Sequence, residues 1–246
     1  IKMNESSERA GVAVKDSCDQ LPARLAALLG DEYVLTDAAS RRFHAQDVHG
    51  SGVLPLAVAR PGSVEELAAT VQLVTAAGAA VVARGGGMSY TDGYLPIREN
   101  TVTFDTTRLN RIVEINPQDR YVTVECGVTW KALAEALAPH ALRTPYWGPL
   151  SGLRATVGGA LSQGSIFLGS GLHGPVQESL LALEVVLADG SLLKTGGAAL
   201  VRVVAPTHLK EMTYLFELAM SDGTSSWWRG SEGDWTRHSL DAEGAA

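Results

Sequence analysis

The chain has 246 residues, of which 46% are hydrophobic and 19% are charged, a balance typical of a folded globular protein. Its 27 acidic and 20 basic side chains give a formal net charge of −7, and they form no basic stripe, so we expect no nucleic-acid partner. No apolar run approaches the roughly 18 residues of a membrane helix, and the amino terminus carries no signal-peptide core. We therefore expect no membrane partner and a cytoplasmic location.

Neither the cysteines nor the histidines indicate a metal site. Cys18 and Cys126 lack metal-ligand spacing and imply no disulfide framework, which is typical of a reducing compartment. His44 and His49 flank Asp47, but nothing else supplies a ligand shell. For these histidines we expect a solvated or capping role, and no bound metal.

The amino-terminal half predicts a β-α-β unit after a polar lead-in over residues 1–53. Residues 20–29 are typical of a short helix that ends at Gly30, whereas the hydrophobic residues of 31–53 show no clear helical or strand periodicity. Residues 54–60 predict a buried strand and residues 61–78 a helix, in which Ser63 is the expected N-cap and Glu66 follows three positions later. Residues 79–83 are the next predicted strand, and it ends directly at a glycine loop.

The rest of the chain predicts further strands, one helix and a hairpin. Extended segments are expected at 101–105, 111–115 and 121–127, a helix at 129–137, and a β-hairpin over 179–196 with Asp189-Gly190 at its turn. This mixture predicts an α+β fold of two lobes, about 54–116 and 117–200. Residues 201–246 are expected to be a divergent tail, with loop or disordered character.

The glycine loop, RGGGMSY at residues 84–90, admits two interpretations. A tight turn is one of them. A G-x-G-x-x-G fingerprint would require glycine at Tyr90, and no P-loop pattern is present. Successive glycine N–H groups can nevertheless point into one concavity, where Ser89 and Thr91 add hydroxyl donors. The second interpretation is therefore an anion-binding site, for which a diphosphate is the expected ligand.

A second glycine-rich segment, ATVGGALSQGS, covers residues 155–165. By itself it favours close packing, because paired glycines let a helix begin close against a strand. A third stretch, GSGLHG at 169–174, follows it. Together with the first loop, these segments favour a long ligand lying between two lobes.

In their order and spacing, RGGGMSYTDGYLP, YVTVECGVTWKALAEAL, RTPYWGPLSGLRATVGGALSQGS and LALEVVLADGSLLKTG resemble FAD-linked oxidases of the vanillyl-alcohol oxidase and p-cresol methylhydroxylase (PCMH) superfamily. The resemblance covers roughly residues 54–197 and implies a two-lobed, PCMH-type FAD-binding domain. It implies FAD contacts in the first glycine loop at Arg84, Gly85, Gly86, Gly87, Met88, Ser89 and Tyr90. Further along the chain it implies contacts at Pro149, Leu150, Ser151, Thr156, Val157, Gly158, Gly159, Gln163, Gly164 and Val185.

The resemblance also implies how the cofactor is attached and what it does. Many members link FAD to a histidine of the first loop, but Met88 stands at that position, so non-covalent binding is expected there. The implied enzyme is an FAD-dependent oxidoreductase that passes hydride from a small alcohol or hydroxy acid to flavin, with reoxidation by oxygen or another acceptor. His173 is expected to be a bystander. Tyr146 and Trp147 either border the flavin or pack in the core.

Residues 201–246 match nothing in the family, so the chain resembles a protein truncated before its substrate domain. A second hypothesis is therefore a catalytically inactive FAD-binding remnant. A third is an NADPH-dependent reductase of the related cell-wall precursor type. The sequence assigns neither a general base nor an oligomeric state.

Overall fold

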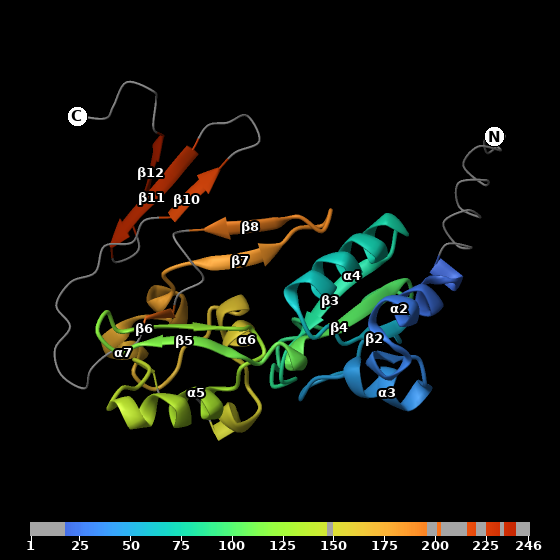
Figure 1. Cartoon of the computed structure of the whole chain (residues 1–246), viewed down its shortest axis with the longest axis horizontal. Helices are drawn as coiled ribbons and strands as arrows, with labels where there is room; N and C mark the ends of the chain where they lie inside the picture. Colours follow the sequence, from blue (N-terminus) through green and yellow to red (C-terminus); the bar gives the residue numbers. More distant parts are fainter. Residues whose placement is uncertain are drawn as a thin grey trace.

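The computed structural model describes residues 18–146, 150–195, 201–202, 216–219, 225–231 and 234–239. Two lobes lie side by side in Figure 1, one drawn in blue to green and the other in lime to yellow. Each lobe has its own hydrophobic core. The mixed helices and sheets confirm the α+β fold that the sequence predicts.

The first lobe is built on a four-stranded sheet in the order β1-β2-β4-β3, in which β2, β4 and β3 run parallel and β1 is antiparallel. The strands are β1 (Val34–Leu35), β2 (Ala57–Ala59), β3 (Ala80–Arg84) and β4 (Thr101–Asp105). Its helices are α2 (Leu21–Leu29), α3 (Ala38–His44) and α4 (Val64–Ala76). Helices α2 and α4 contact each other, and their buried side chains share one core with the sheet.

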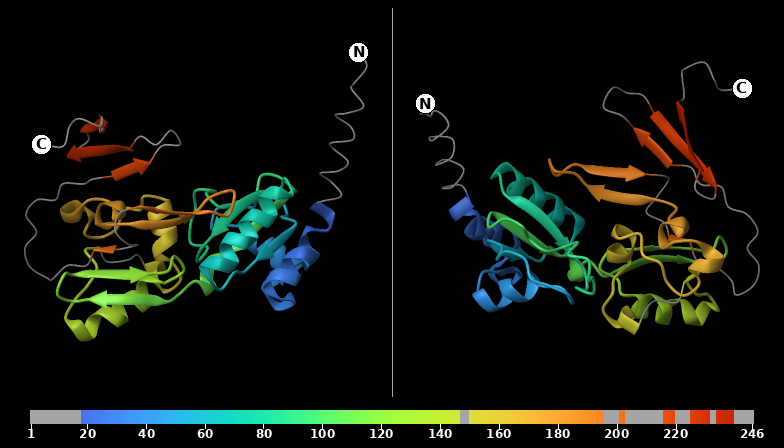
Figure 2. Two further views of the ribbon diagram at one scale, coloured as in Figure 1. Left: turned by 45° about the horizontal axis from the view of Figure 1, so that its top comes forward. Right: turned by 180° about the vertical axis from the view of Figure 1, so that it is seen from behind.

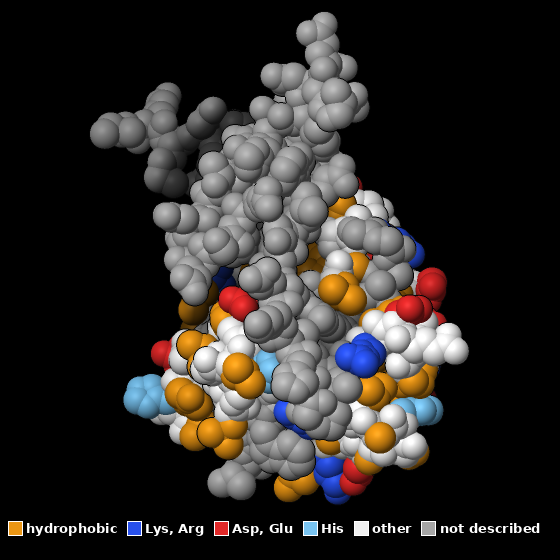
Figure 3. Space-filling view, turned by 90° about the vertical axis from the view of Figure 1, so that its left-hand side faces the viewer, with side chains coloured by type: hydrophobic (Ala, Val, Ile, Leu, Met, Phe, Trp, Pro, Cys, Tyr) orange, Lys and Arg blue, Asp and Glu red, His pale blue; other side chains and the backbone are white. Residues whose placement is uncertain are grey.

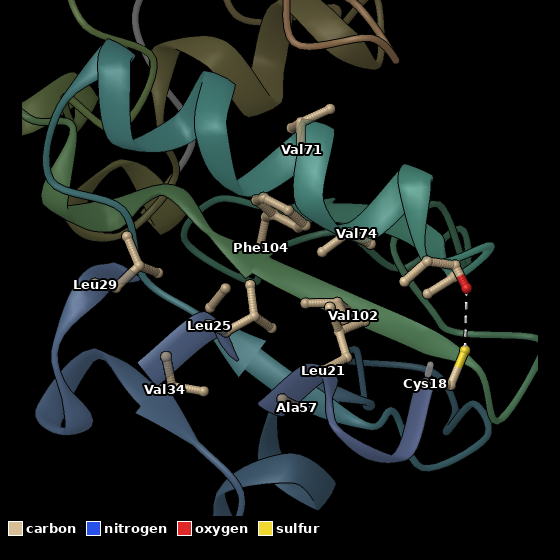
Figure 4. Packing of buried hydrophobic residues seen from close by; sticks show 13 residues of the cluster. Cys18, Leu21, Leu25, Leu29, Val34, Ala57, Val71, Val74, Val102 and Phe104 are labelled. Carbon is tan, nitrogen blue, oxygen red and sulfur yellow. Dashed lines mark hydrogen bonds between the residues drawn. The ribbon is translucent and has the colours of Figure 1, made fainter. Parts of the chain in front are cut away.

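Residue spacing explains why α2 and α4 bury one face each. Leu21, Leu25 and Leu29 recur at every fourth position of α2 and point into the core with Val74 and Phe104 (Figure 4). The backbone N–H of Gly30 closes α2 by donating to the Ala26 carbonyl at 2.8 Å. The β-α-β prediction is confirmed, with β4 inserted between β2 and β3.

The predicted N-cap of α4 is also confirmed, and it offers a stability test. Ser63 Oγ accepts a hydrogen bond from the Glu66 N–H at 3.1 Å, and Glu66 Oε2 accepts from the Gly62 N–H at 2.7 Å. We expect Ser63→Ala to lower the free energy of unfolding by about 1 kcal/mol, because one N-terminal N–H loses its acceptor. Urea unfolding measures the change, and Ser63→Asp, which keeps an acceptor, should restore most of it.

The second lobe contains the antiparallel sheet β5-β6-β9, packed against α5 and α6. Its strands are β5 (Ile112–Asn116), β6 (Tyr121–Val124) and β9 (Val201–Arg202), and its helices are α5 (Trp130–Leu137), α6 (Val157–Ser162) and α7 (Ser170–His173). Tyr146 is buried in this core and donates its hydroxyl to the Pro175 carbonyl at 3.2 Å. Tyr146 is therefore a packing residue, while Trp147 lies outside the described residues.

The predicted hairpin, β7 (Leu183–Val186) with β8 (Leu192–Thr195), reaches back to the first lobe (Figures 1 and 2). Thr75 Oγ1 in α4 donates to the Ala188 carbonyl at 2.6 Å. Gly190 at the turn has φ +82°, and a Cβ there would press on the backbone of Ala68. The left-handed turn thus lets the hairpin lie against α4.

Three features differ from the sequence predictions. The lead-in belongs to the first lobe, since α2 and β1 contribute to its core. Strand β5 pairs with β6 in the second lobe, although residues 111–115 were assigned to the first. The predicted tail contains a three-stranded antiparallel sheet, β10 (Phe216–Ala219), β11 (Ser225–Ser231) and β12 (Asp234–Ser239). The domain boundaries themselves stay predictions.

Within the described ranges, no helix is long and apolar enough to cross a bilayer. On the face drawn in Figure 3, acidic and basic side chains are interspersed among hydrophobic and neutral ones. The coloured part of that face shows no continuous basic stripe.

Candidate functional site

The candidate site lies where the first lobe meets the second, at the carboxyl ends of the parallel strands. Arg84 ends β3 and Asp105 ends β4, and the two are paired in register. In open α/β sheets this edge is the usual place for ligands. The glycine loop leaves β3 at this edge, and the chain enters the second lobe just after β4.

The first glycine loop packs directly on the second glycine-rich segment. A Cβ on Gly86 would overlap the carbonyl oxygen of Arg154, and a Cβ on Gly85 would overlap Thr156 Oγ1. Gln163, which caps the carboxyl end of α6, donates its side-chain N–H to Ser89 Oγ. The two segments, far apart in sequence, therefore converge. The absent side chains at Gly85 and Gly86 serve this contact between lobes, a reason that the sequence interpretation did not anticipate.

The backbone amides of the loop are available to a ligand. Among the described residues, no protein acceptor receives a hydrogen bond from the N–H groups of residues 85–90. Gly87 has φ +69°, a conformation that favours glycine. Successive unpaired N–H groups in a turn form an anion-binding concavity. Amides without a protein acceptor are the kind of donor that can bind a negatively charged group.

Arg84 places a buried positive charge beside these amides. Its side chain is 5% exposed, and its guanidinium carbon lies 5.1 Å from the Phe43 ring centre and 5.3 Å from that of Tyr94. Arg84 Nε and the Tyr94 hydroxyl are buried without a hydrogen-bond partner in the described structure. Burial lowers the pKa of Arg84 and raises the pKa of Tyr94. Buried polar atoms of this kind normally have a partner, which a bound ligand or an ordered water molecule would supply.

Asp105 holds a second cluster on the same edge. His44 Nε2 lies 3.5 Å and Arg60 Nε 3.1 Å from Asp105 Oδ2, while Thr107 donates its backbone N–H and its hydroxyl to Oδ1 at 3.0 and 2.6 Å. Burial alone would raise the pKa of Asp105. The hydrogen bonds from His44 and Thr107 and the charge of Arg60 outweigh it and hold that pKa well below its usual range.

A cavity of about 460 Å³ opens at this junction. It is bounded by residues of both lobes: Leu35, Phe43, His44, Arg60, Arg84, Gly85, Gly86, Asp105, Thr107, Thr129, Leu153 and Arg154. Three of these residues are arginines, and Asp105 is the one carboxylate among them. The cavity therefore favours an anion, with apolar surface from Leu35, Phe43 and Leu153 beside it.

The structure brings most of the predicted FAD contacts into two adjoining groups. Arg84 to Tyr90 form the loop, while Thr156 is the N-cap of α6, Gln163 ends it, and Gly164 follows with φ +58°. Leu150 and Ser151 lie in a 3-10 helix that leads to α6, and Val185 lies in β7 on the hairpin. Pro149 is outside the described residues. As FAD contacts, all these assignments stay predictions.

The sequence interpretation missed the contribution of the lead-in to the site. His44 was expected to be solvated or to cap a helix. The solvated alternative is wrong, because His44 is 7% exposed and faces Asp105. The capping alternative agrees with its place at the end of α3, where its Nδ1 lies 2.8 Å from the Ser40 carbonyl oxygen. Asp47 accepts hydrogen bonds from the N–H groups of Gly50 and Asp92, at 2.7 and 3.0 Å, so it ties the lead-in to the loop region. The available signal was Asp37, an N-cap type residue whose side chain accepts from Ser40 at 2.8 Å and begins α3.

Comparison with known proteins identifies the family. A model described as FAD binding domain matches residues 55–196. The uncharacterized FAD-linked oxidoreductase YgcU of Escherichia coli is 32% identical over 170 residues, covering 68% of this chain and 35% of that protein. The probable mitochondrial D-lactate dehydrogenase of Danio rerio is 30% identical over 194 residues, 78% of this chain and 38% of that protein. The glycolate oxidase subunit GlcD of E. coli is 30% identical over 173 residues, which cover 70% of this chain and 34% of that protein.

Solved structures agree with this assignment at the level of fold. Alkyldihydroxyacetonephosphate synthase superposes with a TM-score of 0.68 at 18% identity, over 80% of this chain and 42% of that one. p-Cresol methylhydroxylase superposes with a TM-score of 0.63 at 21% identity, over 74% of this chain and 36% of that one. The chain belongs to the FAD-binding domain family, and the resemblance to the PCMH superfamily is confirmed. It spans about a third of the length of the curated relatives it matches, which are FAD-linked oxidoreductases.

Proposed function

We propose that this chain is the FAD-binding part of an FAD-dependent oxidoreductase that takes hydride from a small alcohol or hydroxy acid. The observation that carries the proposal is the row of amides at residues 85–90 without a protein acceptor, which lies beside the buried Arg84, whose Nε also lacks one. These residues fall within the segment that matches the FAD binding domain model. This donor set suits the diphosphate of FAD, because it offers neutral N–H groups and one cation where anionic charge would lie. Bound FAD would supply a flavin ring that accepts hydride.

The chain's own residues would bind the cofactor and fix its orientation. The loop amides and Arg84 would hold the diphosphate, and the Gln163–Ser89 hydrogen bond would keep the loop against α6. Met88 stands where the resemblance implies a flavin-linking histidine in many family members, and it offers no atom for such a link, so FAD would bind non-covalently there. The D-lactate and glycolate in the names of two relatives favour 2-hydroxy acids as the first substrates to test.

A second candidate is a flavin-binding protein without catalysis. The two candidates share the cofactor site and differ only in turnover. The cytoplasmic location, the small-molecule partner and the lack of nucleic-acid or membrane partners stay predictions from composition.

Flavin content and flavin reduction test the proposal. The purified chain, reconstituted with FAD, should show flavin absorption near ~370 and ~450 nm, as expected of the bound cofactor. Acid precipitation should release the flavin into the supernatant, since no covalent link is expected. Anaerobic addition of D-lactate, glycolate or a primary alcohol should bleach the 450-nm band.

Each outcome separates the candidates. Bleaching by a hydroxy acid or alcohol supports the oxidoreductase, and flavin binding without bleaching by any of them supports the non-catalytic protein. Bleaching by NADPH alone would support the reductase considered from the sequence. A chain that retains no FAD at micromolar concentration contradicts all three.

A further inference from the structure

The outer surface of helices α2 and α4 forms a second hollow, a groove of about 660 Å³. The groove shares no residue with the cavity between the lobes. In Figures 1 and 2, α2 lies on the side of the first lobe away from α5 and α6. Three residues of α2 and four of α4 line the groove: Arg24, Ala27, Leu28, Ala69, Gln72, Leu73 and Ala76.

Most of this groove is apolar although it faces solvent. Residues 67–83, which include most of α4, contain no charged side chain. On α2, Ala27 is exposed and Leu28 is 41% exposed. The outward face of a surface helix normally carries charged and polar side chains. An exposed apolar helix face of this kind marks an interaction surface.

The two helices run antiparallel, which fixes the two ends of the groove. Cys18, just before α2, donates its Sγ–H to the carbonyl of Ala77, just after α4, at 3.5 Å (Figure 4). Arg24 therefore lies toward the carboxyl end of α4, whereas Leu28 lies toward its amino end.

The ends of the groove carry opposite charges. Arg24 is exposed near one end. At the other end, the acidic side chains of Asp31 and Glu32, just beyond α2, and of Glu65, at the start of α4, are exposed. Within the described ranges, none of these four side chains forms an ion pair. The surface is thus basic at one end, acidic at the other and apolar between them.

A surface with this order of charges is complementary to itself. Arg24 and Asp31 stand at equal distances in sequence on either side of Ala27 and Leu28. A two-fold axis that crosses α2 at Ala27 and Leu28 makes the α2 helices of two copies antiparallel. Each Arg24 then faces the acidic end of the other copy, as the isologous contact of a two-fold dimer requires.

We propose that this chain forms a two-fold symmetric dimer through the groove between α2 and α4, with Leu28 of both copies at the axis and Arg24 of each copy paired with the acidic end of the other. The alanines that line the groove favour this packing, because small side chains let helix axes approach to about 8 Å. The occupant is a second copy because one surface supplies both charges and the apolar strip between them. The dimer does not depend on the proposed function.

Sedimentation velocity of the full chain, over concentrations from about 1 to about 100 μM, tests the dimer. Leu28→Glu should raise its dissociation constant about a hundredfold, because the symmetry brings two like charges together at the axis. Ala27→Glu should act in the same direction. Leu172→Glu is the matched control and should leave the dimer intact, since Leu172 is 81% exposed on α7 of the second lobe.

Charge reversal tests how the two copies are arranged. Arg24→Glu, and separately Asp31→Lys combined with Glu32→Lys, should each weaken the dimer about tenfold, because like charges then face each other. An equimolar mixture of the two variants should dimerise like the wild type. In the mixed dimer, each end again faces the opposite charge.

The outcomes decide the proposal. Wild-type protein that stays monomeric at about 100 μM overturns it, and so does a dimer that both Leu28→Glu and Ala27→Glu leave intact. A dimer that Leu172→Glu weakens equally, or a charge-reversed mixture that stays monomeric, also overturns it. Circular dichroism checks that each variant is folded, and should Leu28→Glu not fold, the exposed Ala27 decides the question. A dimer that binds no FAD contradicts the proposed function alone.

Discussion

Gly86→Val is expected to lose FAD and to loosen the contact between the lobes. The new side chain would overlap the Arg154 carbonyl, which is backbone and cannot turn aside like a flexible side chain. Inserting atoms into a tight contact costs about 3 kcal/mol, and applied to cofactor binding this is an affinity loss of about a hundredfold. Flavin content after purification and fluorescence titration with FAD measure the loss.

Gly171→Val is the matched control for this change. A Cβ at Gly171 would meet nothing within 4 Å, and the residue lies in the short helix α7. Valine has a slightly better helix propensity than glycine, so the control is expected to change stability by less than about 1 kcal/mol. Unchanged flavin content in the Gly86 variant would remove the contact between the two glycine segments from the cofactor site.

Asp105→Asn should lower the free energy of unfolding at neutral pH by about 2 kcal/mol. The change leaves His44 and Arg60 facing a neutral side chain, and breaking a buried ion pair is costly. We expect less than the roughly 3–5 kcal/mol of a fully buried pair, because the Arg60 side chain is 33% exposed and therefore partly screened by water. Denaturant unfolding at pH 7 measures the difference.

The same pair gives a pH dependence with a defined sign. The pKa of Asp105 in the folded protein lies below that of an unfolded chain, about 3.9. Its contribution to stability is therefore complete above about pH 5 and is lost as the pH falls through the folded-state pKa. The gap between wild type and Asp105→Asn should shrink below about pH 4, as the Asp105 carboxylate becomes protonated. A gap that stays the same or widens below about pH 4 would contradict the assignment.

Local signals account for the elements that the sequence predicted well. The four-residue spacing of leucines in α2, the Ser63 cap of α4 and the Asp189-Gly190 turn each act within a few residues. The family resemblance predicted the PCMH-type fold, and the comparisons confirm it. Helix α3 escaped prediction because only His44 of its seven residues is buried, so it has no apolar period to detect.

Long-range contacts account for what the sequence left open. Nothing near Arg84 in the chain distinguishes a surface arginine from a buried one. Its environment comes from Phe43, some forty positions earlier in the chain, and from Tyr94 beyond the loop. The burial and contacts of His44 in α3 likewise depend on Asp105, which lies at the end of β4. Pairing of this kind is set by sheet order, which a single sequence does not display.

The sequence by itself determined that the backbone near residues 84–90 and 155–165 must be free of side chains at several points, since glycine is the residue that permits it. Only the tertiary structure decided what uses that freedom. Gly85 and Gly86 make room for Thr156 and the Arg154 carbonyl of the other lobe, while the loop's N–H groups stay unpaired. The physical reason is that a missing Cβ is a local property, whereas the group that fills its place arrives from a distant part of the chain.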